Sequence, residues 1–570
     1  MKNIYTTLLI FVLVSCNSDK TPLDESTGNH SEDSTEVAEN KAIQEAESLE
    51  ALEDVQREIQ AFFETKAPEV RYFIDEIELY SSEVLPRAYI NKVFQPLWLK
   101  NRKETKALIE NFIDYLENIK FHGFDKNDYH FEKISEYYEE FKSSSYSESS
   151  VFSLAKLDIY LSDAYLLLSS HLYHGKYDPE NLTIQYGIQR GKPELELDLK
   201  LYKATSFGDF YKTMEVFYPQ SHGYKNMVEK AKEFNEIAKK DTLINIPRNY
   251  NFSNINTDTT LLKKVHTKLN LLGYTEKSFR EFIRDSSLFE SIIKRVQNDH
   301  GLNTDGSIGK LTFEAINTPI EEREKQLYIN MERIRWLPEK QDEYRIVVNI
   351  ADYTLDVMDG SDTLINMRTI VGRNFRQTPV FESNMTYLVF SPTWTVPPGI
   401  LRNDILPAIK KDKGYLSKNN MIVLDRSGGK VDASQIDWQK MSGGNFPYII
   451  RQMPGKNNAL GNVKFMFPNS HSVYLHDTPS RGLFSKDERA FSSGCIRVEK
   501  PHELAKILLN DSVQWNDDRI QAAMRLSNER TVLLKRPIKV YLYYLTAWNG
   551  NNFRKDIYNR DQRKEKWFEF

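Results

Sequence analysis

The residues best suited to chemistry lie in one stretch near the C-terminal end of the chain, between Tyr474 and Val498. This stretch contains Cys495, and His476 lies upstream of that cysteine. A thiolate is a strong nucleophile, and an imidazole beside it can generate it at neutral pH. Alternating apolar residues predict one strand that ends at His476 and a second that follows Cys495, with a polar loop between them. The sequence therefore predicts a strand–loop–strand unit that brings a thiol and an imidazole together.

The residues around Cys495 suit the later steps of an acyl transfer. Gly494 lets the backbone bend and leaves amides unshielded, so the amides of Ser493, Gly494 and Cys495 are candidates for an oxyanion site. Arg497 follows the nucleophile by two residues, which predicts that both side chains share a strand face. Its guanidinium suits the recognition of a substrate carboxylate, and the alternative is a structural ion pair.

The first residues have the pattern of an export signal. Lys2 supplies a positive charge, a short apolar run follows, and Leu13-Val14-Ser15-Cys16 has the form of a lipobox. Because the apolar run is too short to span a membrane, residues 1–15 are predicted to be a signal peptide and Cys16 the lipidated first residue of the mature chain. Acyl chains on Cys16 would hold the protein at a bilayer. The alternative is a plain secretory signal with an unrelated cysteine.

Residues 16–50 are rich in Ser, Thr, Glu and Asp and have few apolar side chains. We expect this segment to be a flexible tether, because it cannot bury enough apolar surface to order itself. The chain has two cysteines, Cys16 and Cys495. If Cys16 carries lipid, Cys495 has no internal disulfide partner and is a candidate reactive thiol. The alternative for Cys495 is a small buried apolar residue.

The composition places limits on the kind of protein. The chain has 570 residues and a formal net charge of −5. This length has room for several domains, and the charge gives no basic surplus, so nucleic acid is not an expected partner. After the N-terminal signal, no segment is long and apolar enough to be expected to cross a membrane.

The periodicity of apolar residues changes along the chain. It is helical in the first half, and the segment Leu154–Leu172 is apolar on most faces, which predicts a buried helix. Short strands with Gly, Asp and Asn turns dominate the second half. The predicted fold class is a multidomain α+β protein, with a helical domain at 51–250, a small helical module at 256–319, a β-rich domain at 326–548 interrupted by an insertion at 401–445, and a C-terminal tail at 549–570.

The motif Ser492-Ser493-Gly494-Cys495-Ile496-Arg497, together with His476, resembles the signature of the L,D-transpeptidases, the YkuD-type cysteine enzymes of bacterial cell walls. Their usual motif has a histidine where this chain has Ser493. The same departure occurs in the large, multidomain YcbB-like subclass. The segments Phe94–Leu99 and Tyr173–Pro179 resemble parts of the scaffold domain of that subclass.

A second resemblance concerns the small module. The pattern that starts at Gln297 and continues through Gly301, Asp305, Gly306 and Thr312 is similar to that of the three-helix peptidoglycan-binding domain. Extra charged sequence between Tyr274 and Leu288 departs from the compact form of that domain. The resemblance implies the fold, and it leaves open whether this copy binds glycan.

These resemblances imply a β-rich YkuD-type catalytic domain whose insertion caps the active site. The implied activity is formation of 3–3 peptidoglycan cross-links through a thioester on Cys495, with release of D-alanine. His476 would be the base, oriented by the backbone carbonyl of Asp477, and Arg497, Tyr474 and Trp394 are the expected substrate-binding residues. The family implies acylation by carbapenems and no metal or other cofactor. We expect a monomeric lipoprotein, anchored on the periplasmic side of the cell envelope at the outer membrane, with peptidoglycan stem peptides as partners.

Two alternatives remain at this point. A hydrolase of the same fold, such as an L,D-carboxypeptidase or an enzyme that cuts cross-links, would use the same residues and admit water. A non-catalytic lipoprotein that links the membrane to the wall would need neither Cys495 nor His476. The pair of nucleophile and base favours an enzyme.

Overall fold

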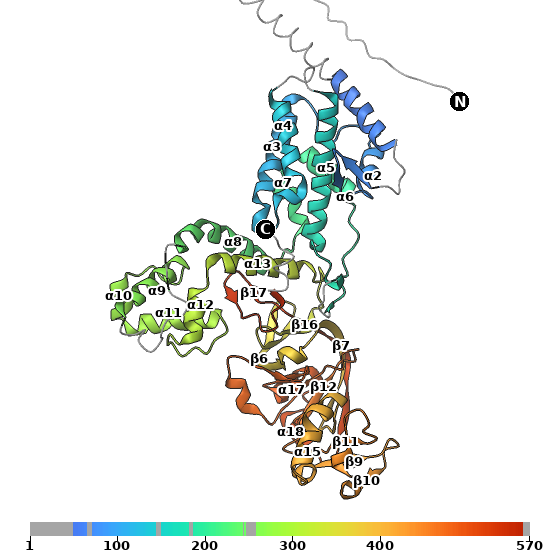
Figure 1. The fold of residues 1–570 in the computed structure, drawn as a ribbon, viewed down its shortest axis with the longest axis vertical. Helices are drawn as coiled ribbons and strands as arrows, with labels where there is room; N and C mark the ends of the chain where they lie inside the picture. The colour runs from blue at the N-terminus through green and yellow to red at the C-terminus, as the bar shows by residue number, and fades with distance from the viewer. Residues whose placement is uncertain are drawn as a thin grey trace, which may run out of the picture.

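The computed structural model describes residues 49–64, 71–143, 150–181, 186–242, 244, 246 and 258–561. The predicted signal peptide, Cys16 and most of the expected tether lie outside the described residues. The described chain forms a helical region, a small helical module and a β-rich domain, and the helices α8 and α13 lie where these parts meet (Figure 1). Among the described residues, no helix combines the length and the hydropathy that a membrane crossing requires.

The helical region is built around α5, which is apolar on almost every face and buried along its length. The buried carboxylate of Asp158 on this helix accepts hydrogen bonds from the amides of Leu97, Trp98 and Leu99, at 2.8–3.2 Å, so it holds the Trp98 loop against the core. The elements of this region are β1 (Tyr72–Ile74), β2 (Ile77–Leu79), α2 (Leu85–Ile90), α3 (Arg102–Asn118), α4 (Phe131–Ser143), α5 (Val151–His174), α6 (Leu197–Phe207), α7 (Phe210–Met214) and α8 (His222–Asp241).

The small module has its own apolar core, formed mainly by Val265, Leu269, Ile293 and Phe313. Its helices are α9 (Thr259–Leu271), α10 (Phe279–Arg284), α11 (Ser286–Asp299) and α12 (Lys310–Asn317). The extra charged sequence forms the short helix α10, which begins with a capping box between Ser278 and Glu281.

The β-rich domain contains a closed sheet. Its strand order is β12-β13-β15-β6-β5-β4-β16-β7-β3, and β12 also pairs with β7, so the sheet curls back on itself. Its strands are β3 (Tyr186–Gly187), β4 (Tyr344–Asn349), β5 (Thr354–Asp359), β6 (Asp362–Gly372), β7 (Val380–Phe390), β12 (Val463–Met466), β13 (Leu475–His476), β15 (Ile496–Val498) and β16 (Arg530–Tyr543), and β14 (Ala490–Ser492) pairs with β6. The helices α17 (Pro501–Leu509) and α18 (Asp517–Ala523) contribute apolar residues to the core of this domain.

The insertion is a subdomain with a separate core and a separate sheet, ordered β10-β9-β11-β8. It extends beyond the expected range 401–445, because the first strand of the small sheet precedes that range and its partner strand follows it. Its elements are β8 (Trp394–Thr395), α14 (Pro398–Ile400), the π-helical turn η7 (Leu401–Ile405), α15 (Leu406–Lys411), α16 (Tyr415–Lys418), β9 (Met421–Leu424), β10 (Lys430–Val431) and β11 (Ile449–Gln452).

Residues 547–561, which we call the C-terminal segment, are folded into the protein. The segment starts with a hairpin of β17 (Ala547–Trp548) and β18 (Asn552–Phe553) and then runs along α13 (Ile320–Arg335). Tyr558 is completely buried, and the carboxylate of Asp561 pairs with Arg333 of α13 at 2.6 Å. The tail was expected to begin at residue 549, whereas the described fold continues to residue 561.

The structure confirms the predicted fold class, with a helical N-terminal region and a β-rich C-terminal domain in a multidomain chain. One strand does not follow the predicted domain boundaries. β3 belongs to the sequence range of the helical domain, and it adds to the catalytic sheet by pairing in parallel with β7. The helical region and the catalytic domain are thereby joined through backbone hydrogen bonds.

Candidate active site

The candidate active site lies on the neighbouring parallel strands β13 and β15. The register pairs His476 with Arg497, so these two side chains lie on one face of the sheet. Tyr474 and Cys495 precede them by two residues each and continue the same face. Tyr474 makes contact with both functional groups: its ring lies 5.7 Å from the imidazole of His476, and its hydroxyl hydrogen-bonds the thiol of Cys495.

Cys495 is partly exposed and is the free thiol among the described residues. Its Sγ donates to the carbonyl oxygen of Ser472 at 3.7 Å. Burial raises the pKa of the thiol above its ordinary value, and the hydrogen bonds from Tyr474 and the charge of Arg497 oppose this shift. The resting thiol is therefore protonated at neutral pH, and it would have to lose its proton to act as a nucleophile.

His476 is buried, and its orientation is fixed by its own chain. The Nδ1 atom lies 2.6 Å from the carbonyl oxygen of Asp477. Because a carbonyl oxygen only accepts, Nδ1 carries the proton and Nε2 is left as the acceptor. Burial, followed by the positive charge of Arg497, lowers the pKa of His476 to about 3. The imidazole is therefore neutral and able to take a proton at physiological pH.

The carboxylate of Asp477 is not directed at the imidazole. It accepts hydrogen bonds from the amide of Asn462 at 2.9 Å and from the guanidinium of Arg481 at 3.1 Å. Gly461 packs so closely on this carboxylate that a Cβ there would collide with it. The side chain of Asp477 thus holds the turn before β12, while its backbone carbonyl holds His476.

The loop before Cys495 has an unusual backbone at Gly494, where φ is +119°, a conformation that favours glycine. The sequence predicts an oxyanion role for the Gly494 amide, but in the structure this amide donates to Ser492 Oγ at 3.1 Å. Ser492 Oγ in turn donates to the carbonyl of Cys495 at 2.6 Å. An oxyanion would have to displace Ser492 to use the Gly494 amide, whereas Ser493 lies on the exposed side of the loop.

Arg497 is half-buried, and its Nε atom has no hydrogen-bond partner among the described residues. Burial, followed by the nearby charge of Arg373, lowers its pKa from the ordinary value. Arginine remains protonated after such shifts, so a positive charge that has no carboxylate partner within the described part of the chain shares a strand face with Cys495 and His476. This is the chemistry of a site that receives an anion.

Sequence reasoning missed residues that contact the nucleophile loop from the segment after β6. Arg376 donates to Ser493 Oγ at 2.8 Å and pairs with Asp404 of the insertion at 3.1 Å. Arg376 therefore joins the insertion to the loop that carries Cys495. No motif marks this residue, because the contact spans more than a hundred positions of the chain.

The expected substrate-binding residues fall in different places. Tyr474 and Arg497 lie beside Cys495. Trp394 lies in β8 of the insertion, where it packs against the core of that subdomain. The structure thus brings together Cys495, His476, Arg497 and Tyr474, and it places Trp394 in a separate packing environment.

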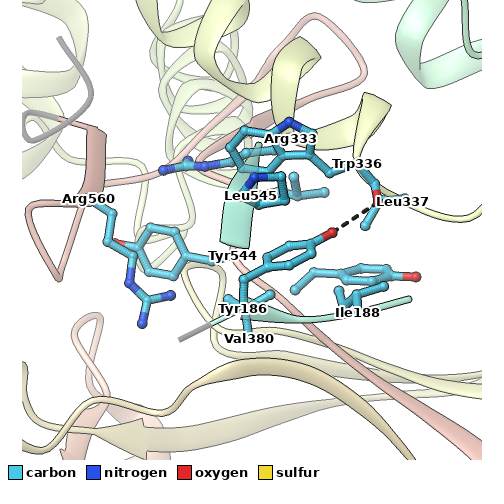
Figure 2. A pocket seen from close by; sticks show the side chains of 11 residues that line it. Tyr186, Ile188, Arg333, Trp336, Leu337, Val380, Tyr544, Leu545 and Arg560 are labelled. Carbon is cyan, nitrogen blue, oxygen red and sulfur yellow. Dashed lines mark hydrogen bonds between the residues drawn. The ribbon is translucent and has the colours of Figure 1, made fainter. Parts of the chain in front are cut away.

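Two hollows in the protein are not lined by Cys495 or His476. One is a cavity of about 30 Å³ lined by aromatic residues that include Tyr186 and Tyr544, with Arg560 at its edge (Figure 2). It has room for one or two water molecules at about 15 Å³ each, which is too small for a peptide. The other is a cleft of about 880 Å³ between the small module, the catalytic domain and the C-terminal segment.

Taken together, the site has a neutral thiol, a neutral imidazole with a free acceptor nitrogen, and an arginine for which the described residues supply no carboxylate partner. These are the groups needed to attack a carbonyl carbon and to transfer the thiol proton. The thiol's hydrogen-bond partners among the described residues are Ser472 and Tyr474. Attack therefore requires the thiol to rotate toward the imidazole.

Comparisons with known proteins show which domains this chain resembles. Residues 343–520 match the L,D-transpeptidase catalytic domain, YkuD, and residues 83–230 match a Scaffold domain. A Haemophilus influenzae protein named "Putative L,D-transpeptidase" is 40% identical over 242 residues, which are 42% of this chain and 48% of the relative. The match thus spans about half the length of this curated relative. The chain contains a YkuD-type catalytic domain and a scaffold domain, so the resemblance to these two domains is confirmed.

Proposed function

We propose that the protein is a cysteine-dependent L,D-transpeptidase that forms 3–3 cross-links in peptidoglycan. Its donor substrate would be a tetrapeptide stem, and its acceptor the side-chain amine of a second stem. The YkuD match supports a peptidoglycan-modifying enzyme, and the arrangement around Cys495 supports acyl transfer as its chemistry.

In the proposed reaction, the sulfur of Cys495 attacks the carbonyl at the L-centre of the third residue of the donor stem. His476 Nε2 takes the thiol proton and passes it to the amine of the departing D-alanine as the carbon–nitrogen bond breaks. A thioester remains on Cys495. The acceptor amine then attacks this thioester, loses a proton to His476 and releases the thiol, so the proton count closes over the cycle.

The observation that carries the proposal is the tautomer of His476. Its Nδ1 is held by the Asp477 carbonyl at 2.6 Å, which leaves Nε2 as an acceptor on the strand face that Cys495 continues. In this site a backbone carbonyl orients the imidazole, a role that a carboxylate has in other nucleophile–base pairs. For the oxyanion we assign the amides of Cys495 and Ser493, because the Gly494 amide is already engaged by Ser492.

Arg497 is assigned to a carboxylate of the stem peptide. Its lack of a carboxylate partner among the described residues supports this role over a structural ion pair. Its charge would also keep the imidazole neutral, because it lowers the pKa of His476. One side chain could thus bind the substrate and hold the base in its working protonation state.

The cell-envelope setting follows from the other parts of the chain. We propose that Cys16 carries lipid, that residues 16–50 give the enzyme reach from the membrane, and that it works on the periplasmic side of the envelope as a monomer. Acylation of Cys495 by carbapenems is expected from the family. No metal or other cofactor enters the proposed reaction.

The proposal is tested by mass spectrometry of products after the enzyme meets a tetrapeptide-bearing disaccharide, with Cys495→Ala in parallel. A dimer that has lost one D-alanine, formed by the wild type and not by the variant, is the expected result. Tripeptide monomer without dimer would replace the transferase with an L,D-carboxypeptidase. Absence of any thiol-dependent product would refute the catalytic proposal and leave a wall-binding protein.

A further inference from the structure

The C-terminal segment reaches the nucleophile loop through a small set of buried hydrogen bonds. Tyr558 and Thr378 are both completely buried, and they lie beneath Gly494. The hydroxyl of Tyr558 accepts from the amide of Thr378 at 3.2 Å and donates to the carbonyl of Gly372 at 2.7 Å. The end of the chain is thus fixed to the turn between β6 and β7.

Thr378 continues the network to the nucleophile loop. Its Oγ1 accepts from the amide of Gly372 at 3.0 Å and donates to the carbonyl of Gly494 at 2.8 Å. This hydroxyl therefore acts as both a donor and an acceptor of hydrogen bonds. Gly372 has no space for a side chain, since a Cβ there would collide with the carbonyl of Arg376. The four residues Gly372, Thr378, Gly494 and Tyr558 form a closed and buried support.

The bond to Gly494 has a consequence for Cys495. The carbonyl of Gly494 and the amide N–H of Cys495 belong to one planar peptide unit, in which they point in opposite directions. A hydroxyl that holds this carbonyl toward the interior therefore turns the N–H of Cys495 toward the outside of the loop. Because Gly494 has φ of +119° and nothing closer than 3.9 Å to a Cβ placed on it, local packing alone does not fix this peptide.

We propose that Thr378 and Tyr558 are positioning residues that orient the Gly494–Cys495 peptide, and thereby aim the Cys495 amide at the oxyanion formed during acyl transfer. This inference rests on the proposed function for the identity of the reaction. It assigns a role in the chemistry to the C-terminal segment. Neither residue contacts the substrate, and both act through the backbone of the nucleophile.

The rest of the C-terminal segment is built to hold Tyr558 in place. The ring of Tyr558 stacks on Tyr544 with centroids 5.4 Å apart, and the guanidinium of Arg560 lies 4.6 Å from the centroid of Tyr544. Figure 2 shows Arg560 beside Tyr544 at the edge of the small aromatic cavity. Arg560 also donates to the carbonyl of Thr378 at 3.2 Å. Earlier in the segment, Arg554 donates to the carbonyl of Asp299 in the small module at 2.6 Å.

The test compares two reagents that react with the same thiol. p-Nitrophenyl acetate is attacked at its carbonyl carbon, passes through an oxyanion, loses p-nitrophenolate and leaves an acetyl thioester. Iodoacetamide is attacked at a saturated carbon and loses iodide, so no oxyanion forms. Rates are measured for the full chain by mass spectrometry of the acid-quenched peptide that contains Cys495, which separates this thiol from Cys16 and from lysines.

The variants remove single hydroxyl groups. Thr378→Val and Tyr558→Phe should each slow acetylation by about tenfold to a hundredfold, below or near the effect of deleting one oxyanion donor. Both should change the iodoacetamide rate by less than about twofold, since that reaction does not use the amide. Thr378→Ser, which keeps the hydroxyl, should restore acetylation.

Tyr541→Phe is the matched control. Tyr541 is a buried tyrosine of the same domain, and its hydroxyl donates to Asp342 at 3.0 Å. This hydrogen bond does not involve Gly372, Thr378, Gly494 or Tyr558. The variant should lower the melting temperature and leave the ratio of the two rates unchanged.

The outcomes separate the two proposals. If Tyr558→Phe and Thr378→Val slow both reagents equally, or if Tyr541→Phe changes the ratio as they do, the positioning role is refuted while the reactive thiol stands. If the wild-type thiol reacts with neither reagent, the proposed function fails and the positioning role fails with it. A selective loss of acetylation in the two variants, restored in Thr378→Ser, supports the inference.

Discussion

Two glycine-containing motifs of this chain differ in how they use their polar groups. In the small module, the side chain of Gln297 donates to Asp305, Ser307 and Thr312 at 2.7–3.1 Å and accepts from the amide of Gly306 at 2.9 Å. The polar side chains of the motif that resembles a peptidoglycan-binding domain are thus hydrogen-bonded to other residues of the same motif. In the catalytic domain, by contrast, the thiol of the motif is partly exposed and Arg497 keeps an unpartnered Nε among the described residues.

The difference shows what each motif is for. A buried polar side chain whose bonds are all internal holds a loop in shape, and its sequence pattern reports the fold. A half-buried cation whose Nε has no partner among the described residues costs stability, and a partly exposed thiol beside it is accessible, as is usual in a site that meets a ligand. The hydrogen bonds within the module motif therefore account for its sequence pattern as support for the loop 301–312, without a bound glycan. The polar groups of the Cys495 motif are not accounted for by such internal support, and a substrate is the expected partner.

The largest effect should come from the catalytic motif. Cys495→Ala is expected to abolish thiol-dependent turnover, a loss of at least about a thousandfold, because the nucleophile has no substitute. Its free energy of unfolding should change by less than about 1 kcal/mol, since the thiol is partly exposed and sulfur is a weak partner in its hydrogen bonds with Ser472 and Tyr474. Product analysis and denaturant unfolding measure the two quantities. A strongly destabilised variant would mean that Cys495 is a structural residue.

The module motif should behave in the opposite way. Gln297→Ala leaves the amide of Gly306 and the hydroxyl of Thr312 without their partner, so we expect a loss of about 2–3 kcal/mol in the free energy of unfolding. The rate of Cys495 acetylation should not change. Asn298→Ala, at an exposed position of the same helix, is the control and should cost less than about 0.5 kcal/mol. Equal stability of both variants would contradict the structural reading of the motif.

A substitution of Arg497 tests whether this residue binds the substrate or forms a structural ion pair. Arg497→Gln should lower kcat/KM for a stem peptide by about tenfold to a hundredfold, because a charge-assisted bond to a carboxylate is lost. A substrate whose carboxylate is amidated should react poorly with the wild type and should be little affected by the substitution. The comparison is a double-mutant cycle across enzyme and substrate. Equal losses with both substrates would assign Arg497 to the fold.

The smallest effect concerns pH. Burial disfavours the charged form of each group, so it raises the pKa of the Cys495 thiol and lowers that of His476 to about 3. Both groups are therefore neutral between pH 5 and 7, and the acetylation rate of Cys495 should change by less than about twofold in that range. The rate should fall as the pH approaches 3, where the imidazole gains a proton. An inflection near pH 6.5, the ordinary histidine value, would show that the imidazole is not shielded as the structure indicates.

The sequence was sufficient for the features that are local. The alternation around His476 and Cys495 predicts the two strands, and the apolar faces of Leu154–Leu172 predict the buried helix α5. The sequence could not show that Thr378 supports Gly494, because the contact joins positions more than a hundred residues apart. The engagement of the Gly494 amide by Ser492 was also hidden, since it depends on a side-chain rotamer.

The full extent of the insertion and of the C-terminal segment could not be predicted from the sequence, because both depend on contacts between distant residues. The insertion is wider than its helical sequence suggests, because its sheet is closed by short strands on both sides of the irregular stretch. The C-terminal segment is polar in composition, and its burial depends on a few anchors such as Tyr558 and Arg560. A short polar segment with isolated buried residues has no periodicity from which packing can be predicted.

The measurement that tests the central claim most directly is mass spectrometry of the full chain after it is mixed with the tetrapeptide disaccharide in the absence of an acceptor. The account predicts a covalent adduct equal in mass to the substrate minus D-alanine, located on the peptide that contains Cys495 and removed by hydroxylamine, as a thioester should be. The adduct should be absent from Cys495→Ala and should form much more slowly in His476→Ala. Cross-linked product without an adduct on Cys495, or an adduct on another residue, would contradict the assignment of Cys495 as the nucleophile.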